Sequence, residues 1–185
     1  GELSLGQAGF MCIGAFSSAF FSKCTAQTIT NPFIRFPLAI LIGAICAAIF
    51  GILIGMIVLR LQGDYLAIVT LAFGEIIKNV INAVYVGLDS KGFHFSLKDA
   101  SDLKLQEGGL VIINGPQGIT GAPQDTNFTV SVILLILSFI IVANLINSRS
   151  GRAIMAIRDN RIAAEAMGID ISKYRILAFT VTAAL

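Results

Sequence analysis

Charged residues are scarce in this chain of 185 amino acids. Asp, Glu, Lys and Arg together make up 13% of the sequence, whereas about 25% is usual for a soluble domain. Hydrophobic residues make up 56%. This balance excludes an ordinary water-soluble core and predicts a protein embedded in a lipid bilayer. The formal net charge is only +2 and no basic face stands out, which argues against a nucleic-acid partner.

The sequence also has few residues of the kinds that bind metals or perform catalysis. It contains one histidine, His94, and three cysteines, Cys12, Cys24 and Cys46. The cysteines form no CxxC pair, so a metal site with normal ligand spacing is excluded, while a Cys12–Cys24 disulfide stays open. No Ser/His, paired-Asp or HExxH set is present, and there is no GxxxxGK[ST] phosphate loop. We therefore expect neither an enzyme nor an ATPase, and no cofactor.

Long apolar runs dominate the chain, and five of them match membrane-spanning helices in whole or in part. They cover residues 5–21, 36–59, 65–84 and 128–146, and the fifth begins near Tyr174. Helices are expected because lipid offers the backbone no hydrogen-bond partner. The predicted fold is all-α, a polytopic transmembrane helical bundle forming one domain over residues 1–185. Because the chain lacks an initial methionine and ends in an apolar run, we expect it to be cut at both ends.

Basic residues predict which links face the cytoplasm. Six of them lie in or next to the link at residues 149–172: Arg149, Arg152, Arg158, Arg161, Lys173 and Arg175. The link at residues 87–127 holds three lysines and five acidic residues, a balance of 3 − 5 = −2. The first link is therefore predicted to be cytoplasmic and the second to be an external loop. Glycines and prolines near the end of the external loop favour a chain of turns, although a small subdomain or a partner-binding segment stays open.

The stretch RDNRIAAEAMGID, residues 158–170, lies between two apolar runs. Ser150 can cap a helix that begins near Arg152, alanines continue it to Met167, and Gly168 is a suitable end. Asp170 or Ser172 can then cap the last apolar segment. Small side chains along one strip of this helix would let another protein approach closely. A solvated basic loop that only fixes the orientation of the spans explains the same pattern.

Polar residues interrupt the third apolar segment. Glu75, Lys78, Asn79 and Asn82 lie inside it, although a charge at the centre of a membrane costs about 2.5–3.5 kcal/mol on insertion scales. Glu75 and Lys78 are three residues apart, so they share a helix face and can pair. This face either lines a transport pathway or holds an ion pair between packed helices. Tyr65, at the start of the segment, is a further pathway candidate.

The first two apolar segments are rich in glycine. In the first, glycines permit close helix packing or a broken helix near the midplane of the membrane. In a broken helix, Ser4 and Gln7 would supply polar contacts to a solute. In the second, Gly51 and Gly55 form a GxxxG pair that predicts a helix-packing face.

Four stretches of the sequence occur in an order that resembles the permease subunits of the branched-chain amino acid ABC importer family. LSLGQAGFMCIGAF (residues 3–16) is similar to the family's early motif, RLQGDYLAIVTLAFGEII (60–77) to its central motif and NGPQGITG (114–121) to its outer-loop glycine motif. RAIMAIRDNRIAAEAMGID (152–170) resembles its cytoplasmic coupling segment. Together they span nearly the whole chain. Cys12 departs from the small residue expected there, and residues 89–110 match no motif.

The resemblance implies a transport subunit whose short cytoplasmic helix docks into a separate ATP-binding subunit. The residues that match the coupling signature are Arg158, Asp159, Ala163, Ala164, Glu165, Ala166 and Gly168. The implied partners are a second related permease subunit in a heterodimer, two ATP-binding cassette subunits and an external solute-binding protein. The implied setting is a bacterial cytoplasmic membrane, across which branched-chain amino acids move by alternating access.

Two other functions fit parts of the same pattern. An ATP-independent transporter or channel subunit would use Glu75 and Lys78 as proton- or ion-coupling groups, but it would have no need of an alanine-rich docking surface. Within the ABC family, urea and short amides are alternative solutes, because the external binding protein largely selects the solute.

Overall fold

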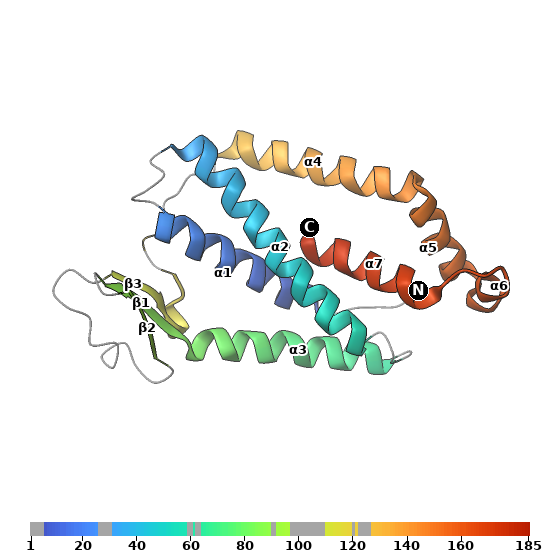
Figure 1. Ribbon diagram of the computed structural model, residues 1–185, viewed down its shortest axis with the longest axis horizontal. Coiled ribbons are helices and arrows are strands. Elements are labelled where there is room, and N and C mark those ends of the chain that lie inside the picture. Colours follow the sequence, from blue (N-terminus) through green and yellow to red (C-terminus); the bar gives the residue numbers. More distant parts are fainter. Residues whose placement is uncertain are drawn as a thin grey trace.

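The computed structural model describes residues 6–25, 31–58, 61, 64–89, 92–96, 110–119, 121 and 127–185. These residues form a bundle of helices with one small sheet (Figure 1). The helices are α1 (Gln7–Thr25), α2 (Pro32–Val58), α3 (Asp64–Ala83), α4 (Phe128–Asn147), α5 (Arg149–Asp159), α6 (Arg161–Ala166) and α7 (Ile171–Ala184). The strands are β1 (Tyr85–Asp89), β2 (Gly92–Ser96) and β3 (Leu110–Asn114), and a short 3₁₀ turn, η2 (Gly115–Gln117), follows β3. The predicted helical bundle is confirmed.

Three of the described helices are long and apolar enough to cross a membrane. They are Phe33–Val58, Tyr65–Ala83 and Phe128–Asn147, which correspond to the second, third and fourth predicted segments. α1 and α7 occupy the positions of the first and fifth predicted segments but fall outside this set. α7 begins at Ile171, a few residues before Tyr174. Of the two predicted caps the structure selects Asp170, whose side chain accepts a hydrogen bond from the backbone N–H of Lys173.

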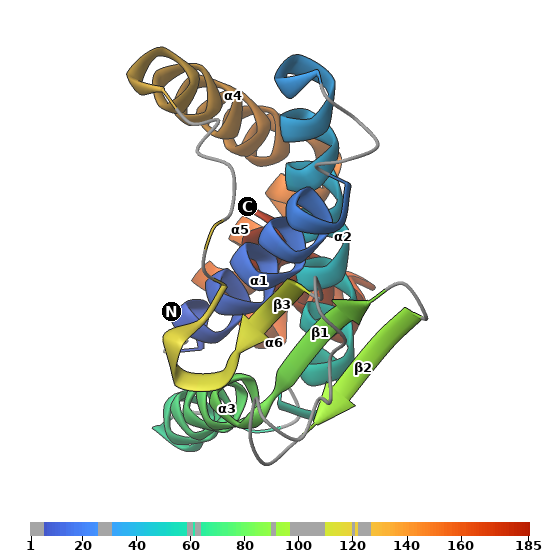
Figure 2. The ribbon, with the colours of Figure 1, turned by 90° about the vertical axis from the view of Figure 1, so that its left-hand side faces the viewer.

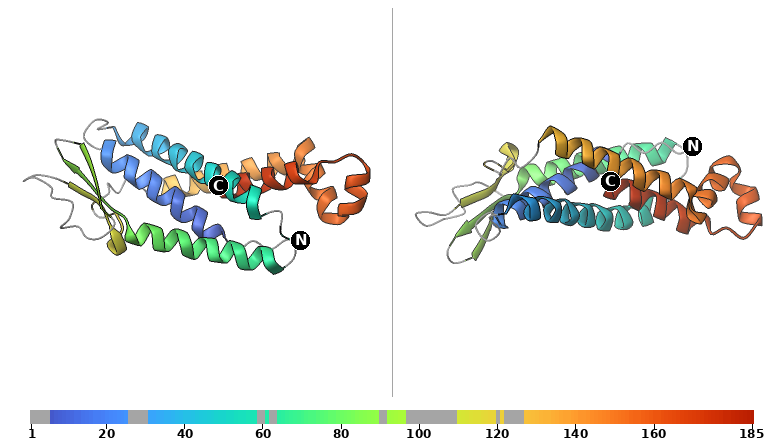
Figure 3. Two further views of the ribbon diagram at one scale, coloured as in Figure 1. Left: turned by 60° about the horizontal axis from the view of Figure 1, so that its bottom comes forward. Right: turned by 90° about the horizontal axis from the view of Figure 1, so that it is seen from above.

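The sheet and the pair α5–α6 lie at opposite ends of the long axis of the molecule (Figures 1 and 3). We call these the sheet end and the loop end. α1 and α3 finish at the sheet end, where α2 and α4 begin, so successive long helices run in alternating directions. This arrangement agrees with a chain that crosses a membrane repeatedly.

An aromatic cluster joins α1, α3 and α7. The ring of Phe10 is 2% exposed and packs against Phe73, with ring centroids 5.5 Å apart, and edge-to-face against Phe179 at 5.3 Å. Ile13 and Ala183 complete the buried cluster. Lipid is as apolar as these side chains, so burying them gives no hydrophobic gain in a membrane. Close van der Waals packing of the rings stabilises the association of the three helices instead.

Glycines set the distances between the packed helices. A Cβ atom at Gly51 of α2 would lie 2.8 Å from the Cβ of Ala183 in α7, and Gly55 is also buried. The structure thus agrees with the packing face predicted on the second segment. α1 is continuous from Gln7 to Thr25, so close packing and not a broken helix is found in its described part. Cys12 and Cys24 lie about 18 Å apart along this helix, and the cysteines are free thiols.

A three-stranded antiparallel sheet of order β2–β1–β3 occupies part of the predicted external loop (Figure 2). Tyr85 is the partner of both Ser96 in β2 and Asn114 in β3, and an irregularity follows Val86. Turn geometry appears where it was predicted, after β3, with a positive φ of 69° at Gly118. A chain of turns alone is therefore wrong for the end of this link, because residues 110–114 form β3 and pair with the distant strand β1.

The link before α7 differs from its prediction in two respects. The N-cap is Ser148, whose hydroxyl accepts a 3.0 Å hydrogen bond from the N–H of Gly151, so α5 starts earlier than the cap at Ser150 predicts. The single predicted helix is also interrupted at Asn160, which is extended and whose side chain accepts from the N–H of Ala163 to start α6. A side-chain acceptor at this position competes with the helical backbone bond and divides the helix. The predicted end at Gly168 is confirmed, with φ at 80°.

Candidate functional site

The predicted coupling residues lie at the loop end, on α5, α6 and the turn that follows (Figure 1). At the end of α5, the Arg158 guanidinium pairs with the Asp159 carboxylate at 2.9 Å. Both side chains are largely exposed, so the pair adds only about 0–1 kcal/mol to stability. The two charges are accessible to a partner and partly neutralise each other.

The alanine cluster of α6 has two distinct faces. Ala163, Glu165, Ala166 and Gly168 are exposed, whereas Ala164 is only 4% exposed and packs against the rest of the chain. Six of the seven predicted coupling residues are therefore exposed at the loop end, although Ala163 and Glu165 lie about 160° apart around α6. Ala164 is the one buried residue of α6, a helix whose main contacts are with α5 and α7.

Ile162 and Met167 are the largest apolar side chains on this exposed surface. They are 81% and 83% exposed, and the exposed alanines of α6 lie between them in the sequence. We call Ile162, Ala163, Ala166 and Met167 the loop-end apolar surface. Ile162 was not among the residues predicted from the sequence, although an isoleucine beside charged residues in a short polar link is a detectable signal. Exposed apolar side chains that cluster in this way are typical of a surface that binds another protein.

The charged residues of α3 pair as predicted, within one helix. Lys78 Nζ lies 3.5 Å from Glu75 Oε2, and the two side chains are 63% and 61% exposed. Asn79 and Asn82 are exposed as well. In the described part of the chain, the pair does not link two packed helices. Glu75 lies about 16 Å from the start of α3 by helical rise, close to its middle.

The other pathway candidates are dispersed. Ser4 lies outside the described residues. Gln7 donates a 2.6 Å hydrogen bond from Nε2 to the carbonyl oxygen of Thr182 in α7, and therefore links α1 to α7. Tyr65 is 72% exposed at the start of α3, about 80° around the helix from Glu75. Among the pathway candidates that the structure describes, only Glu75 and Lys78 lie together.

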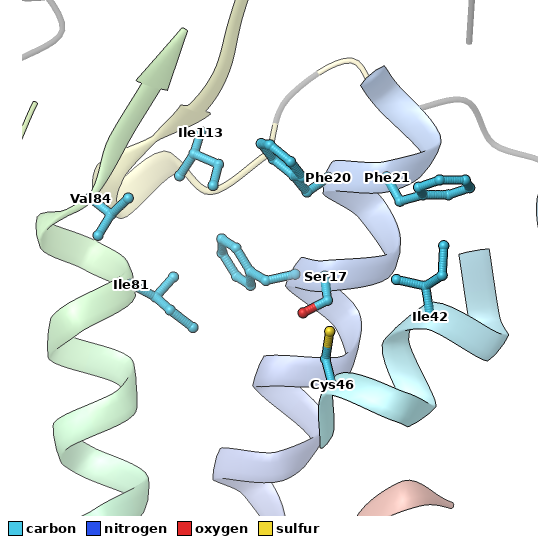
Figure 4. Close-up of a pocket in the computed structure, with 9 residues that line it drawn as sticks. Ser17, Phe20, Phe21, Ile42, Cys46, Ile81, Val84 and Ile113 are labelled. Carbon is cyan, nitrogen blue, oxygen red and sulfur yellow. The ribbon is translucent and has the colours of Figure 1, made fainter. Parts of the chain in front are cut away.

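An apolar cavity of about 380 Å³ lies between α1, α2, α3 and β3 (Figure 4). Its lining consists of Phe16, Ser17, Phe20, Phe21, Ile42, Cys46, Ile81, Val84 and Ile113. Only a hydroxyl and a thiol among these side chains are polar, and none is charged. The charged groups of an amino acid would lose water there without gaining partners. The cavity therefore suits an apolar group and not a zwitterion.

Comparison with known proteins decides the family. The family model described as "Branched-chain amino acid transport system / permease component" matches residues 1–185. The chain belongs to this family. The permease family predicted from the four motifs is thus confirmed, and the three long apolar helices agree with a membrane protein.

Two curated members of the permease family are similar along the whole chain. The high-affinity branched-chain amino acid transport system permease protein LivM of Escherichia coli (strain K12) is 32% identical over 195 residues. The protein of the same name from Salmonella typhimurium (strain LT2) is 31% identical over 195 residues. Each comparison covers 100% of this chain and 44% of the relative, so the chain spans less than half the length of these permeases. No solved structure matches the chain.

Proposed function

We propose that the chain is the permease part of an ATP-driven importer of branched-chain amino acids in a bacterial cytoplasmic membrane. In this proposal, two ATP-binding cassette subunits hydrolyse ATP, and a second related permease subunit completes a heterodimer. An external solute-binding protein delivers the amino acid. The chain moves the solute by alternating access and breaks no bond in it. The solute named for the two LivM relatives supports this class of cargo.

The exposed apolar surface at the loop end is the main observation in favour of this proposal. Ile162 in the six-residue helix α6 and Met167, its C-cap, are 81% and 83% exposed, with Arg158 and Glu165 nearby in the sequence. A loop whose only role is to fix orientation has no need of exposed apolar side chains. A groove on an ATPase subunit would cover them and gain the free energy of burying their apolar area, about 25 cal/mol per Å².

The contacts of α7 provide a mechanical route from this surface into the bundle. α6 is joined to α7 by the short turn at Gly168 and by Asp170, which caps α7. Phe179 of α7 packs on Phe10 of α1, and Ala183 of α7 packs against Gly51 of α2. Close-packed interiors transmit displacement, so a push on α6 would move α7 against α1 and α2.

Charge and geometry support the orientation that this proposal requires. The basic link at residues 149–172 lies at the loop end, and the acidic link at residues 87–127 includes the sheet at the opposite end (Figure 3). We propose that the loop end is cytoplasmic and that the sheet end faces outward, where the solute-binding protein would dock. Within the membrane, we propose that Glu75 and Lys78 line the pathway, with Ser4, Gln7 and Tyr65 as further candidates.

Crosslinking in the complete importer tests the proposed coupling contact. The native cysteines are replaced by serine, and single cysteines are introduced as Ile162→Cys, Met167→Cys and, as the matched control, Ala164→Cys. We expect the first two to form crosslinks with the ATPase subunit, and the buried position 164 to form none. Absence of crosslinks at positions 162 and 167 in an assembled, ATP-hydrolysing complex would contradict the docking role of α6.

Uptake of radiolabelled leucine into proteoliposomes tests the energy source. We expect uptake only when the ATPase subunits and ATP are both present. Equal uptake without the ATPase subunits would instead favour the ATP-independent transporter, in which Glu75 and Lys78 serve as ion-coupling groups.

A further inference from the structure

One face of α3 is polar over only half of the helix. Glu75, Lys78, Asn79 and Asn82 follow the spacing i, i+3, i+4, i+7, so they form one stripe, which we call the polar stripe. All four residues are exposed. Leu66, which is 2% exposed, lies about 180° around the helix from Glu75 and belongs to the face packed on the bundle. The polar stripe therefore points away from the other helices of the described chain.

Toward the loop end, the residues on the same face of α3 are apolar. Ile68 and Leu71 precede Glu75 by seven and four residues, and are 61% and 53% exposed. One continuous face thus changes from apolar to polar at Glu75, near the middle of a helix that is long enough to span a membrane. Lipid against the polar half would impose a cost of about 2.5–3.5 kcal/mol for each charge. The polar half is therefore expected to meet water, and the apolar half to limit how far the water extends.

The Glu75–Lys78 pair is suited to exchange its partners. Its 3.5 Å separation is longer than the usual 2.7–2.9 Å of a charged N–H···O hydrogen bond, and both side chains are exposed. Such pairs add about 0–1 kcal/mol to stability. Separating them costs little if each charge gains a new partner at once. An α-amino acid presents one ammonium and one carboxylate on adjacent carbons, which are the two complementary groups.

We propose that the polar stripe binds the head group of a zwitterionic amino acid. Glu75 accepts hydrogen bonds from the solute's ammonium group, and Lys78 donates to its carboxylate. This inference rests on the proposed importer function and adds a recognition site to it. Replacing one ion pair by two leaves the site electrically neutral, so the solute enters without a net charge in the membrane. No covalent bond is made or broken.

The asymmetry of the stripe orients the bound solute. With the head group at Glu75 and Lys78, an apolar side chain fits against Ile68 and Leu71 on the loop side. In the opposite orientation, the side chain would lie beside the amides of Asn79 and Asn82, which would lose hydrogen bonds with water. The site therefore favours amino acids with apolar side chains, such as leucine. The two asparagines form a polar route that reaches Glu75 from the sheet end.

Substituted-cysteine accessibility tests whether the stripe is wet and binds the solute. In the complete importer with its native cysteines replaced, Asn79→Cys places a thiol on the stripe. Val80→Cys is the matched control, since Val80 is 56% exposed on the adjacent apolar face. We expect a charged thiosulfonate reagent added outside to modify position 79 and not position 80, and saturating leucine to slow that modification. Equal reaction at both positions, or no protection by leucine, would overturn the proposal.

Charge substitution tests the roles of the two ionic groups. Glu75→Gln and Lys78→Gln should each lower leucine uptake about tenfold or more, which is the loss expected for one charge-assisted contact. Assembly of the complex should not change, because both side chains are exposed. Ile76→Ala is the matched control, because Ile76 is 60% exposed off the stripe, and its uptake should be unchanged.

The charge exchange E75K/K78E distinguishes recognition from a structural ion pair. It retains an ion pair but exchanges the positions of the carboxylate and the ammonium group. The solute's head group would then meet like charges in its original orientation, so we expect uptake to stay as low as in the single variants. Full recovery would show a structural pair and overturn the inference while leaving the importer function intact. A wild-type complex without ATP-dependent uptake would instead contradict the importer function itself.

Discussion

At the residue scale, the contact between Gly14 and Gly43 joins α1 and α2 asymmetrically. A Cβ at Gly43 would lie 2.7 Å from the carbonyl oxygen of Gly14 and 3.2 Å from the Cβ of Ser18. A Cβ at Gly14 would lie 3.7 Å from the carbonyl oxygen of Gly43, an ordinary van der Waals distance. We expect Gly43→Ala to lower the stability of the complex by about 1–3 kcal/mol through overpacking. Thermal unfolding in detergent measures the effect.

Gly14→Ala is the control for this prediction. It adds the same methyl group to the same helix pair on the side where space is available, so its thermal stability should match that of the wild type. If both variants unfold at the wild-type temperature, Gly43 does not limit the distance between α1 and α2.

Single residues differed in how well the sequence predicted them. The Glu75–Lys78 pair followed from a spacing of three residues on one helix, and the structure contains it. The burial of Ala164 did not follow, because it depends on how α6 lies against its neighbours α5 and α7. Ser148 and Ser150 are equally good caps by composition, and the position of the turn after α4 selects the first. Local chemistry is visible in the sequence, whereas orientation toward the bundle is not.

At the scale of elements, the break between α5 and α6 sets the direction of the loop-end apolar surface. Asn160→Ala removes the side-chain acceptor for the N–H of Ala163 and should cost about 0.5–2 kcal/mol of cap stability. We expect the two helices to merge in part and to displace Ile162 and Met167. Leucine uptake should then fall while ATP hydrolysis continues, and the ratio of solute moved to ATP hydrolysed measures this loss of coupling.

Asn160→Asp is the matched variant, because its carboxylate retains the capping acceptor. Its coupling ratio should stay near the wild-type value. An unchanged ratio in Asn160→Ala would show that the break does not contribute to coupling.

The long helices were predictable because the length and apolarity of each segment are local properties. The sheet was not, because β1 pairs with β3, whose residues follow more than twenty positions later. The glycine turns near residues 115–121 were visible in the sequence, but the strand before them, LVIIN, is too short to be distinguished from a buried turn segment. The division of the coupling segment was also missed, since alanine-rich sequence favours one continuous helix.

At the scale of the whole molecule, α4 contrasts with the packed group of α1, α2, α3 and α7. It has no buried residue, and it exposes Phe128, Leu135 and Phe139 at 85%, 70% and 72%. A membrane helix with such a surface is bounded by lipid or by other membrane helices. Its connection to α5 at Ser148 places it beside the proposed coupling surface, so it is the second helix, after α7, through which a displacement of the loop end would spread.

The two ends of the molecule provide the last prediction, on orientation across the membrane. Gln117 is exposed in η2 at the sheet end, and Met167 is exposed at the loop end. In a background without native cysteines, we expect Gln117→Cys to react with a membrane-impermeant maleimide in intact cells. Met167→Cys should react only after the cells are opened, because basic residues hold the loop end inside. The reverse pattern would place the loop-end apolar surface outside the cell, where cytoplasmic ATPase subunits cannot bind it, and would exclude the proposed coupling.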